Sequence, residues 1–568
     1  MLTRYRRSLV LVALVAGLTA LVGAAPAEAQ TDYTISGRVV GASTGNPLPG
    51  ANARIVGASF GTATDAEGRF SFTARLQPGQ YQIRVSFVGY KTATRSIELG
   101  DQQEVTLDPF RLAVSAAQFE ELVVTGQAGP TQRKKLGNAI STIDGAELEE
   151  APSTTTLGAL QGKLAGVNIQ QNTGNPAGGT SIRLRGTSTV LGTADPLIVL
   201  DGVIISNDSP TTIDIGGGGG AQNRLLDLNP QDIARIEVVK GAAAAALYGS
   251  RANNGVVQIF TKMGDEGETE ITYNTRVQTQ AIRKTLDVNK AKNDQGQFLN
   301  NNGKPLPSDQ KRWDYQDFIF DRAYGTEQYL SVSGGSEDTR FFTSAGFTNN
   351  QGIVSGTNFR RYNATARIRH TVNDWINIKA GARYARSASD DVPNGGVRAT
   401  YGALTGFIFG PNTKDPRPKG GQYPNVTLFS NPLEVTNRFK FGQTTNRFIG
   451  DFQVDLSPLK GLSINSIVGL DTYEQVGAAY VPPNNTTLQF GGGFSERAEA
   501  SNLQVNADLN VRYETDILPS LSSTSLIGAS LQYENEESFT GNSRGLPLLT
   551  EVASAGSRDH NFGERRLP

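Results

Sequence analysis

Residues 503–514 have the sequence LQVNADLNVRYE, in which apolar and polar side chains alternate without a break. Successive side chains of a β-strand point to opposite faces, so the stretch predicts a strand with one apolar and one polar face. The polar face carries six residues: Gln504, Asn506, Asp508, Asn510, Arg512 and Glu514. A packed protein core does not tolerate so many polar and charged groups. The stretch is therefore typical of a strand that crosses an outer membrane between lipid and a polar lumen.

Similar alternation recurs from residue 268 onward, in EITYNTRVQTQ, in WINIKAGARYARS and in the hairpin RFIGDFQVDLSPLKGLSINSIVGLDTYE. The connections have two lengths: some are short, such as SPLKG, and others are long, such as residues 281–326 and 387–442. Outer-membrane barrels combine short periplasmic turns with long external loops. We therefore predict that residues 268–568 form about ten strands of an antiparallel transmembrane β-barrel. A secreted protein of several β-sandwiches is the alternative, but it does not explain the two loop lengths.

The first 29 residues have the pattern of a secretory signal peptide. Arg4, Arg6 and Arg7 precede an apolar run over residues 9–23, and the small-residue sequence AEA at 27–29 is a cleavage site. We therefore expect the mature chain to begin at Gln30. A membrane anchor is the alternative, but the run is short for a spanning helix.

Composition excludes several kinds of chemistry. The chain has no cysteine, so disulfides, thiol catalysis and cysteine-ligated metals are excluded. Its 53 basic and 54 acidic residues leave a net charge of -1, which disfavours nucleic acid as a partner. His370 and His560 are the only histidines, and neither has the spacing of a zinc ligand. We expect no metal, no other cofactor and no catalytic residue.

Residues 30–110 predict a small all-β domain. FSFTARL and YQIRVSFVGY alternate on either side of the turn sequence Gln77-Pro78-Gly79, which predicts a hairpin with one buried face. ISGRVV, ANARIVG, TRSIEL and QEVTL add further strands. The order G-x-V, PLPGA, TDAEGRF and a final G-Y resembles the carboxypeptidase regulatory-like, transthyretin-type β-sandwich, which implies a spacer or docking module.

Residues 131–262 mix helix and strand. STTTLGALQGKLAGVNI has apolar residues at helical spacing, with Ser153 able to cap the helix and Gly166 able to end it. SIRLRG and DPLIVLDGVII predict strands, the second apolar enough to be buried on both faces. A strand over residues 236–239, an alanine-rich helix ended by Gly249 and a strand over residues 256–261 complete an α+β domain.

Five segments together resemble the TonB-dependent outer-membrane transporters, and among them the SusC/RagA type. They are the sandwich, EELVVTG, LQGKLAGVNI, SIRLRGTSTVLGTADPLIVLDGV and NPQDIARIEVVKGAAAAALYGSRANNGVVQIFTK, and they occur in the family's order. The resemblance implies a mainly β protein in which residues 131–262 are an α+β plug inside the barrel. Family barrels have about 22 strands, and the chain ends at NFGERRLP rather than on an apolar aromatic strand. We therefore expect an incomplete barrel that cannot transport by itself.

The resemblance assigns structural or gating roles in the plug to residues of its I-R-G, V-D-G and K-G…Y-G elements. These residues are Arg183, Arg185, Gly186, Asp201, Gly202, Lys240, Gly241, Tyr248, Gly249 and Gly255. Arginine and aspartate inside a lumen can pair with charges of the barrel wall, and glycines allow close turns. No residue is assigned to the substrate.

A short β-prone run lies in the linker, residues 111–130. It consists of Glu120, Glu121, Leu122, Val123, Val124, Thr125 and Gly126. The resemblance places the family's coupling box here, where an extended segment adds as a strand to the sheet of a TonB-type periplasmic protein. The alternative is an edge strand of the preceding sandwich.

The resemblance implies active import of an oligosaccharide or peptide across the outer membrane. The expected partners are outer-membrane lipid, the nutrient, a TonB-type coupling protein with its inner-membrane motor, and a SusD-like substrate-binding lipoprotein. Siderophore or cobalamin import is the first alternative, and a non-transporting adhesin is the second. A hydrolase is disfavoured because no zinc-ligand spacing or histidine–nucleophile pair is present.

Overall fold

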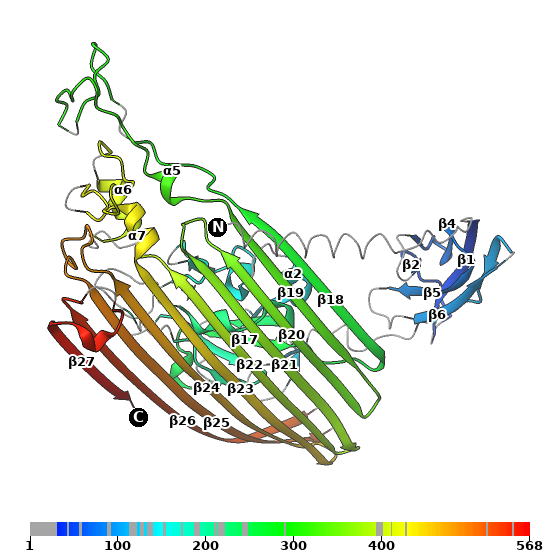
Figure 1. The fold of residues 1–568 in the computed structure, drawn as a ribbon. Helices are drawn as coiled ribbons and strands as arrows, with labels where there is room; N and C mark the ends of the chain where they lie inside the picture. The colour runs from blue at the N-terminus through cyan, green and yellow to red at the C-terminus, as the bar shows by residue number, and fades with distance from the viewer. Residues whose placement is uncertain are drawn as a thin grey trace. The chain divides into compact units, whose positions relative to one another are not determined.

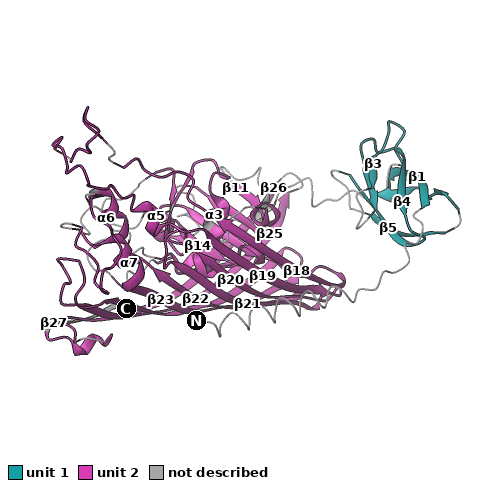
Figure 2. Ribbon diagram, turned by 45° about the horizontal axis from the view of Figure 1, so that its top comes forward, with its two compact units in different colours: residues 1–123, 132–135 teal, residues 124–131, 136–568 magenta. Residues whose placement is uncertain are grey.

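The computed structural model describes residues 31–567 except 43–44, 56–59, 88–92, 101, 113–121, 125–129, 133–139, 151–154, 172–173, 187–193, 209–212, 214–221, 241–247, 289–290, 301, 394–400, 411, 427–428, 519–520 and 548–549. The chain forms two compact units, one of residues 1–123 and 132–135 and one of residues 124–131 and 136–568 (Figure 2). The expected signal peptide lies outside the described residues.

The first unit is a sandwich of two sheets. One sheet contains β4 (Arg69–Leu76), β1 (Thr31–Gly41), β7 (Glu104–Thr106) and β8 (Phe110–Leu112). The other has the order β3 (Gly61–Ala63), β2 (Asn52–Ile55), β5 (Gly79–Ser86) and β6 (Ala93–Leu99). Alternate residues of both sheets, including Tyr33, Ile35, Ile83 and Val85, are fully buried between them.

The predicted hairpin of FSFTARL and YQIRVSFVGY is wrong. β4 pairs with β1, whereas β5 pairs with β2 and β6, so the Gln77-Pro78 connection passes from one sheet to the other. Each strand buries one face, as the alternation predicted, but alternation does not identify the neighbouring strand.

The second unit contains the predicted plug, described here by residues 140–262. Its main sheet has the order β11 (Ile140–Asp144), β16 (Ile233–Val239), β17 (Val256–Thr261), β14 (Leu197–Leu200) and β15 (Val203–Ile205). β12 (Val167–Gln171) pairs with β13 (Thr180–Leu184), and the short helices are α2 (Gly145–Glu149) and α3 (Thr156–Leu160). A shared apolar core includes Leu148, Leu160, Ile236 and Ile259.

Two plug elements differ from the sequence prediction. The helix of STTTLGALQGKLAGVNI ends at Leu160, before Gly162 with its φ of 78°, and its cap is Thr155, whose side chain accepts from the Gly158 amide. Val167 already begins β12. DPLIVLDGVII is a hairpin of β14 and β15 rather than one strand, because the chain turns at Asp201 and Gly202. The predicted alanine-rich helix falls mostly on residues outside the description.

Ten antiparallel strands form one sheet in chain order, here called the wall. They are β18 (Gly267–Gln280), β19 (Ala323–Gly335), β20 (Thr339–Gln351), β21 (Asn358–Asn373), β22 (Ile376–Asp391), β23 (Lys440–Leu459), β24 (Leu462–Val481), β25 (Phe494–Leu518), β26 (Leu521–Arg544) and β27 (Arg558–Leu567). Figure 1 shows these strands side by side, with the plug strands on one face. The strand number and the alternation in LQVNADLNVRYE match the prediction.

The two faces of the wall have opposite polarity. The face away from the plug exposes apolar side chains, among them Tyr273, Leu330, Tyr384, Phe448, Phe452, Val468, Leu503 and Leu509. The face toward the plug buries polar residues, among them Arg361, Thr365, Arg367, Arg383, Arg447, Asp471, Gln504 and Asn506. This is the polarity of a barrel with lipid outside and a polar lumen inside.

Connections at the two ends of the wall differ in length. Lys460 and Gly461 alone join β23 to β24, whereas residues 281–322 and 392–439 join β18 to β19 and β22 to β23. The long connections carry α5 (Gln316–Ile319), α6 (Ala403–Phe409) and α7 (Pro432–Arg438). Among the described residues, no helix is long and apolar enough to cross a membrane.

Candidate functional site

The hairpin between β14 and β15 brings the plug against the wall. Its turn residues, Asp201 and Gly202, have φ angles of 49° and 92°, which an Asp-Gly pair adopts in tight hairpins. The Asp201 carboxylate accepts hydrogen bonds from the amide of Thr261 at 2.9 Å and from its hydroxyl at 2.7 Å. A Cβ on Gly202 would lie 2.5 Å from Ile467 Cδ1 of the wall, so a side chain there would collide.

Two wall arginines bind the same carboxylate. Arg367 Nη1 lies 3.2 Å from Asp201 Oδ1, and Arg383 pairs with the other oxygen while also reaching Asp451 at 2.8 Å. We call Asp201, Thr261, Arg367 and Arg383 the Asp201 clamp. Burial of the Asp201 side chain, which is 4 % exposed, would by itself raise its pKa. Arg367, Arg383 and the Thr261 hydrogen bonds nevertheless hold that pKa below its usual value.

A second buried cluster lies around Arg447 of β23. Its guanidinium pairs with Asp471 at 2.7 Å and donates to the carbonyl oxygens of Arg224 at 2.7 Å and Ser206 at 2.9 Å. The Ser206 amide in turn donates to Asp471 at 2.8 Å. A wall ion pair therefore supplies hydrogen bonds to two plug backbone segments.

A third cluster seats the plug residues 226–232. Asp232 accepts hydrogen bonds from Tyr329 at 2.9 Å, Ser344 at 2.6 Å and Thr365 at 2.8 Å, all from the wall. Arg361, which is fully buried, donates to the carbonyl oxygen of Leu226 at 2.8 Å. Burial without these partners would be costly for every charged group involved.

The three clusters share one property. Each joins plug to wall through side chains, and in the described part of the chain no plug strand pairs with a wall strand. Buried ion pairs contribute little net stability because desolvation offsets their attraction, but removing one partner is strongly destabilising. Such an interface holds the plug in one position and still allows it to detach without unzipping the wall.

Comparison with known proteins agrees with this architecture. The TonB-dependent Receptor Plug Domain family matches residues 132–256, and the CarboxypepD_reg-like domain family matches residues 35–124. "TonB-dependent receptor SusC" of Bacteroides thetaiotaomicron is 31 % identical over 80 % of this chain and 45 % of its own length. "Ferric enterobactin receptor PirA" of Pseudomonas aeruginosa is 32 % identical over only 26 % of this chain and 20 % of its own.

The structure titled "Structure of the RagAB peptide importer in the 'open-open' state" has the same fold. Its TM-score is 0.60 at 20 % identity, over 78 % of this chain and 53 % of that one. The chain belongs to the SusC/RagA-type TonB-dependent receptors. Membership confirms the predicted fold class and the predicted outer-membrane location. The chain spans about half the length of the curated relatives it matches.

The structure places the other predicted plug residues within the plug itself. Arg183 pairs with Asp195 of the plug, not with the wall. Lys240 donates to Ser141 at 2.8 Å, and burial together with the charge of Arg185 lowers its pKa. Four further residues have positive φ angles: Arg185, Gly186, Gly249 and Gly255. Gly241 lies outside the described residues. Tyr248 lines a cavity between the plug and the wall.

The coupling segment is described only at residues 122–124. Leu122–Val124 forms β9, which pairs with β10 (Pro130–Gln132) in a two-stranded sheet. Glu120, Glu121, Thr125 and Gly126 lie outside the description. In the described residues β9 belongs to neither sheet of the sandwich, although the matched sandwich family extends to residue 124.

The wall partners of the plug were not identified from the sequence. Arg361, Asn363, Thr365 and Arg367 occupy every second position of β21 on its lumen face. Arg383 of β22 and Arg447 of β23 lie on the same face of the next two strands. Charged residues with a period of two on the polar side of a membrane-type strand were the available signal.

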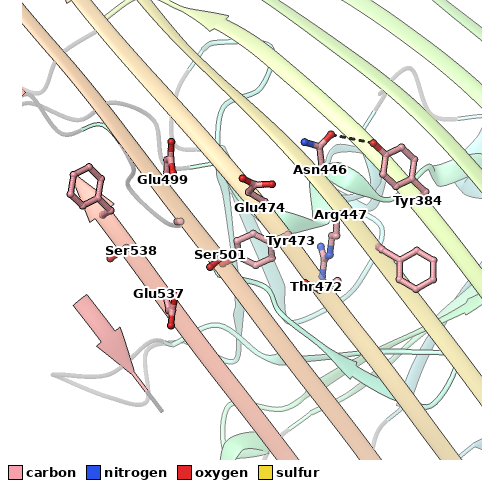
Figure 3. A pocket seen from close by; sticks show the side chains of 13 residues that line it. Tyr384, Asn446, Arg447, Thr472, Tyr473, Glu474, Glu499, Ser501, Glu537 and Ser538 are labelled. Carbon is pink, nitrogen blue, oxygen red and sulfur yellow. Dashed lines mark hydrogen bonds between the residues drawn. The ribbon is translucent and has the colours of Figure 1, made fainter. Parts of the chain in front are cut away.

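A pocket of about 620 Å³ lies across strands β22 to β26 (Figure 3). Tyr384, which donates to Asn446 at 3.2 Å, lines it together with Glu474, Glu499 and Glu537. Tyr384 follows Arg383 in β22, and successive side chains of a strand point to opposite faces of the sheet. Because Arg383 contacts the plug, the Tyr384 side chain points away from the lumen. We assign the pocket no role in cargo passage.

The Asp201→Asn substitution tests the clamp. The depressed pKa means that the carboxylate stabilises the docked plug above about pH 4, its unfolded pKa, and that this contribution is lost as the pH falls through the lower folded value. In the intact receptor, Asp201→Asn should cost roughly 3–5 kcal/mol of local stability at pH 7 and remove this acid sensitivity. Hydrogen exchange of the β17 amides, corrected for intrinsic exchange rates, measures the local stability and its dependence on pH.

Asp455→Asn is the matched control. Asp455 pairs with Lys379 at 2.9 Å, but both side chains are about a third exposed, so its loss should cost at most about 1 kcal/mol. Equal effects of the two substitutions on β17 would contradict the clamp.

Proposed function

We propose that the chain takes part in TonB-dependent active import of an oligosaccharide or peptide across the outer membrane, with the plug gating the lumen. The carrying observation is the way the plug is attached: three clusters of side-chain contacts fix it to the polar lumen face of the wall, whose opposite face is apolar. A passive pore or an adhesin has no need of a plug held in this way.

The order of strands in the plug suits a pull from the N-terminal side. The linker leads into β11, an edge strand whose residues 140–144 pair only with β16. A force that peels an edge strand from its end, away from the sheet, breaks its ladder bonds one at a time, each worth about 0.5–1.5 kcal/mol net. The clamp residues come later in the chain, so they would feel the force after β11 has been peeled away.

The proposed domains are those of the sequence prediction. Residues 1–29 are a signal peptide, 30–110 a sandwich, 111–130 a linker with the coupling segment, 131–262 the plug and 268–568 part of the barrel. The coupling segment adds as a strand to a TonB-type periplasmic protein driven by an inner-membrane motor. In this proposal β9 leaves β10 when it binds that protein.

Oligosaccharide or peptide cargo is favoured over a siderophore. The match to SusC covers 80 % of the chain, whereas the match to the siderophore receptor PirA covers 26 %. A SusD-like lipoprotein is the proposed partner at the external end. Catalysis is no part of the proposal, and the relatives are named as receptors and importers.

Val123→Pro tests the coupling segment. Proline has no N–H and so removes one ladder donor from the added strand. In cells producing the intact receptor, cargo uptake should fall to background and binding to the TonB-type protein should be lost, while cargo binding at the cell surface is retained. Val123→Ile keeps the donor and should behave like the parent. Unchanged uptake by Val123→Pro would make the segment an edge strand of the sandwich.

Purification of the intact receptor from its own membrane tests the cargo class. A substrate-binding lipoprotein should copurify in stable stoichiometric complex, and mass spectrometry identifies it. A receptor that purifies alone and binds an iron chelate tightly would instead support the siderophore alternative.

A further inference from the structure

A cavity of about 580 Å³ lies between the plug and the wall beside the Asp201 clamp. Asp201, Tyr248 and Gln258 line it from the plug, and residues of β21 to β26 line it from the wall. Its lining includes Ser457 and Ser463, which flank the short Lys460–Gly461 turn. The cavity therefore extends from the clamp toward the end of the wall that carries the short turns.

Three buried donor atoms of this lining have no hydrogen-bond partner in the described protein: Gln258 Nε2, Arg367 Nε and Asn510 Nδ2. Their residues are 2 %, 8 % and 5 % exposed. Buried donors are almost always satisfied by protein or by water, so these three give the cavity a polar lining that the oxygen atoms of water or of a ligand can satisfy.

The charge of the lining points the same way. Five basic side chains and three acidic ones line the cavity: Arg235, Arg367, Arg369, Lys379 and Arg512, and Asp201, Asp455 and Asp508. Arg369 forms no ion pair within the described residues, and its Nε lies 3.1 Å from the side-chain amide of Asn377, a neutral acceptor. The Asp455 carboxylate pairs with Lys379 at 2.9 Å. Arg367 is shared between the cavity and Asp201. A ligand with a carboxylate and several carbonyl or hydroxyl oxygens would satisfy Arg369 and the three unpartnered donors together.

We propose that this cavity is a transit site for a short, carboxylate-bearing polar oligomer on its way past the plug. The proposal rests on the import function above and adds the site and the chemistry of the cargo. The cargo carboxylate takes over Arg367 from Asp201, so that occupation of the cavity and opening of the clamp favour each other. The carboxylate of the ligand replaces that of Asp201 as the partner of Arg367. Only hydrogen bonds and ion pairs change in this step.

The absence of native cysteine allows a direct test. Ser463→Cys in the intact receptor places a thiol in the cavity at a residue that is not one of the proposed ligand donors, and Ser308→Cys places one on the exposed connection between β18 and β19. The probes are a tetramannuronate, a tetraglutamate peptide and neutral maltotetraose. The measurement is the rate of thiol modification by a small methanethiosulfonate reagent in energised cells, with uptake of each probe followed in the same cells.

Either carboxylate probe at about ten times its dissociation constant should slow modification of Ser463→Cys about tenfold. Ser308→Cys should be unaffected, and maltotetraose should protect neither. Protection by only one of the two carboxylate probes identifies the cargo as saccharide or peptide. Adding Arg369→Gln should raise the probe concentration needed for protection. Ser457→Cys, on the other side of the short turn, is a second reporter if Ser463→Cys reduces the amount of receptor in the membrane.

Two outcomes separate the site from the function. Uptake of a carboxylate probe without protection of either cavity thiol would overturn the transit site and leave import intact. Absence of energised uptake for every cargo offered to the parent receptor would overturn the import function itself.

Discussion

The pairing of one buried carboxylate, Asp201, with Arg367 and Arg383 is the constraint on which the rest of the architecture depends. A carboxylate at 4 % exposure needs opposite charge beside it, and Arg367 and Arg383 on the lumen face of the wall supply it. That requirement fixes the hairpin turn of the plug against β21 and β22. The same turn then holds β17 through Thr261, so the clamp ties the main plug sheet to the wall beside the Arg447 and Asp232 clusters.

The energetics of this interface suit a gate better than they suit a permanent seal. An apolar plug–wall contact would be stabilised by burial in proportion to its area and would be slow to open. Paired buried charges give little net stability but a strong preference for one geometry, because any displacement leaves charges unpaired. The plug sheet is also arranged with its edge strand β11 nearest the linker, so its least protected strand lies where a pull would enter.

Local pattern predicted much of this fold, and the failures have a common cause. Alternation in LQVNADLNVRYE correctly separated the lumen face from the lipid face, since that signal lies within one strand. The FSFTARL–YQIRVSFVGY hairpin failed because strand pairing across a sandwich is set by partners distant in the chain. Asp201 was singled out by its motif, but Arg383, 182 residues away, could not be matched to it from spacing alone. The Asp-Gly pair in DPLIVLDGVII is a hairpin-turn signal, but the apolar residues on both sides of it led to the prediction of one continuous strand.

A reversible cross-link between plug and wall tests the central claim, that the plug must leave the wall for cargo to pass. A Cβ on Gly469 of β24 would lie 2.8 Å from that of Val203 in β15, so a small shift suffices to reach the roughly 3.5–4.5 Å of a disulfide. In the otherwise cysteine-free receptor, Val203→Cys with Gly469→Cys should abolish energised uptake when oxidised and restore it on reduction, and Val203→Cys alone should stay active under both conditions. Gly469→Cys alone is no control, because its Cβ would collide with Cγ1 of Val203. Full uptake with the disulfide intact would contradict the account.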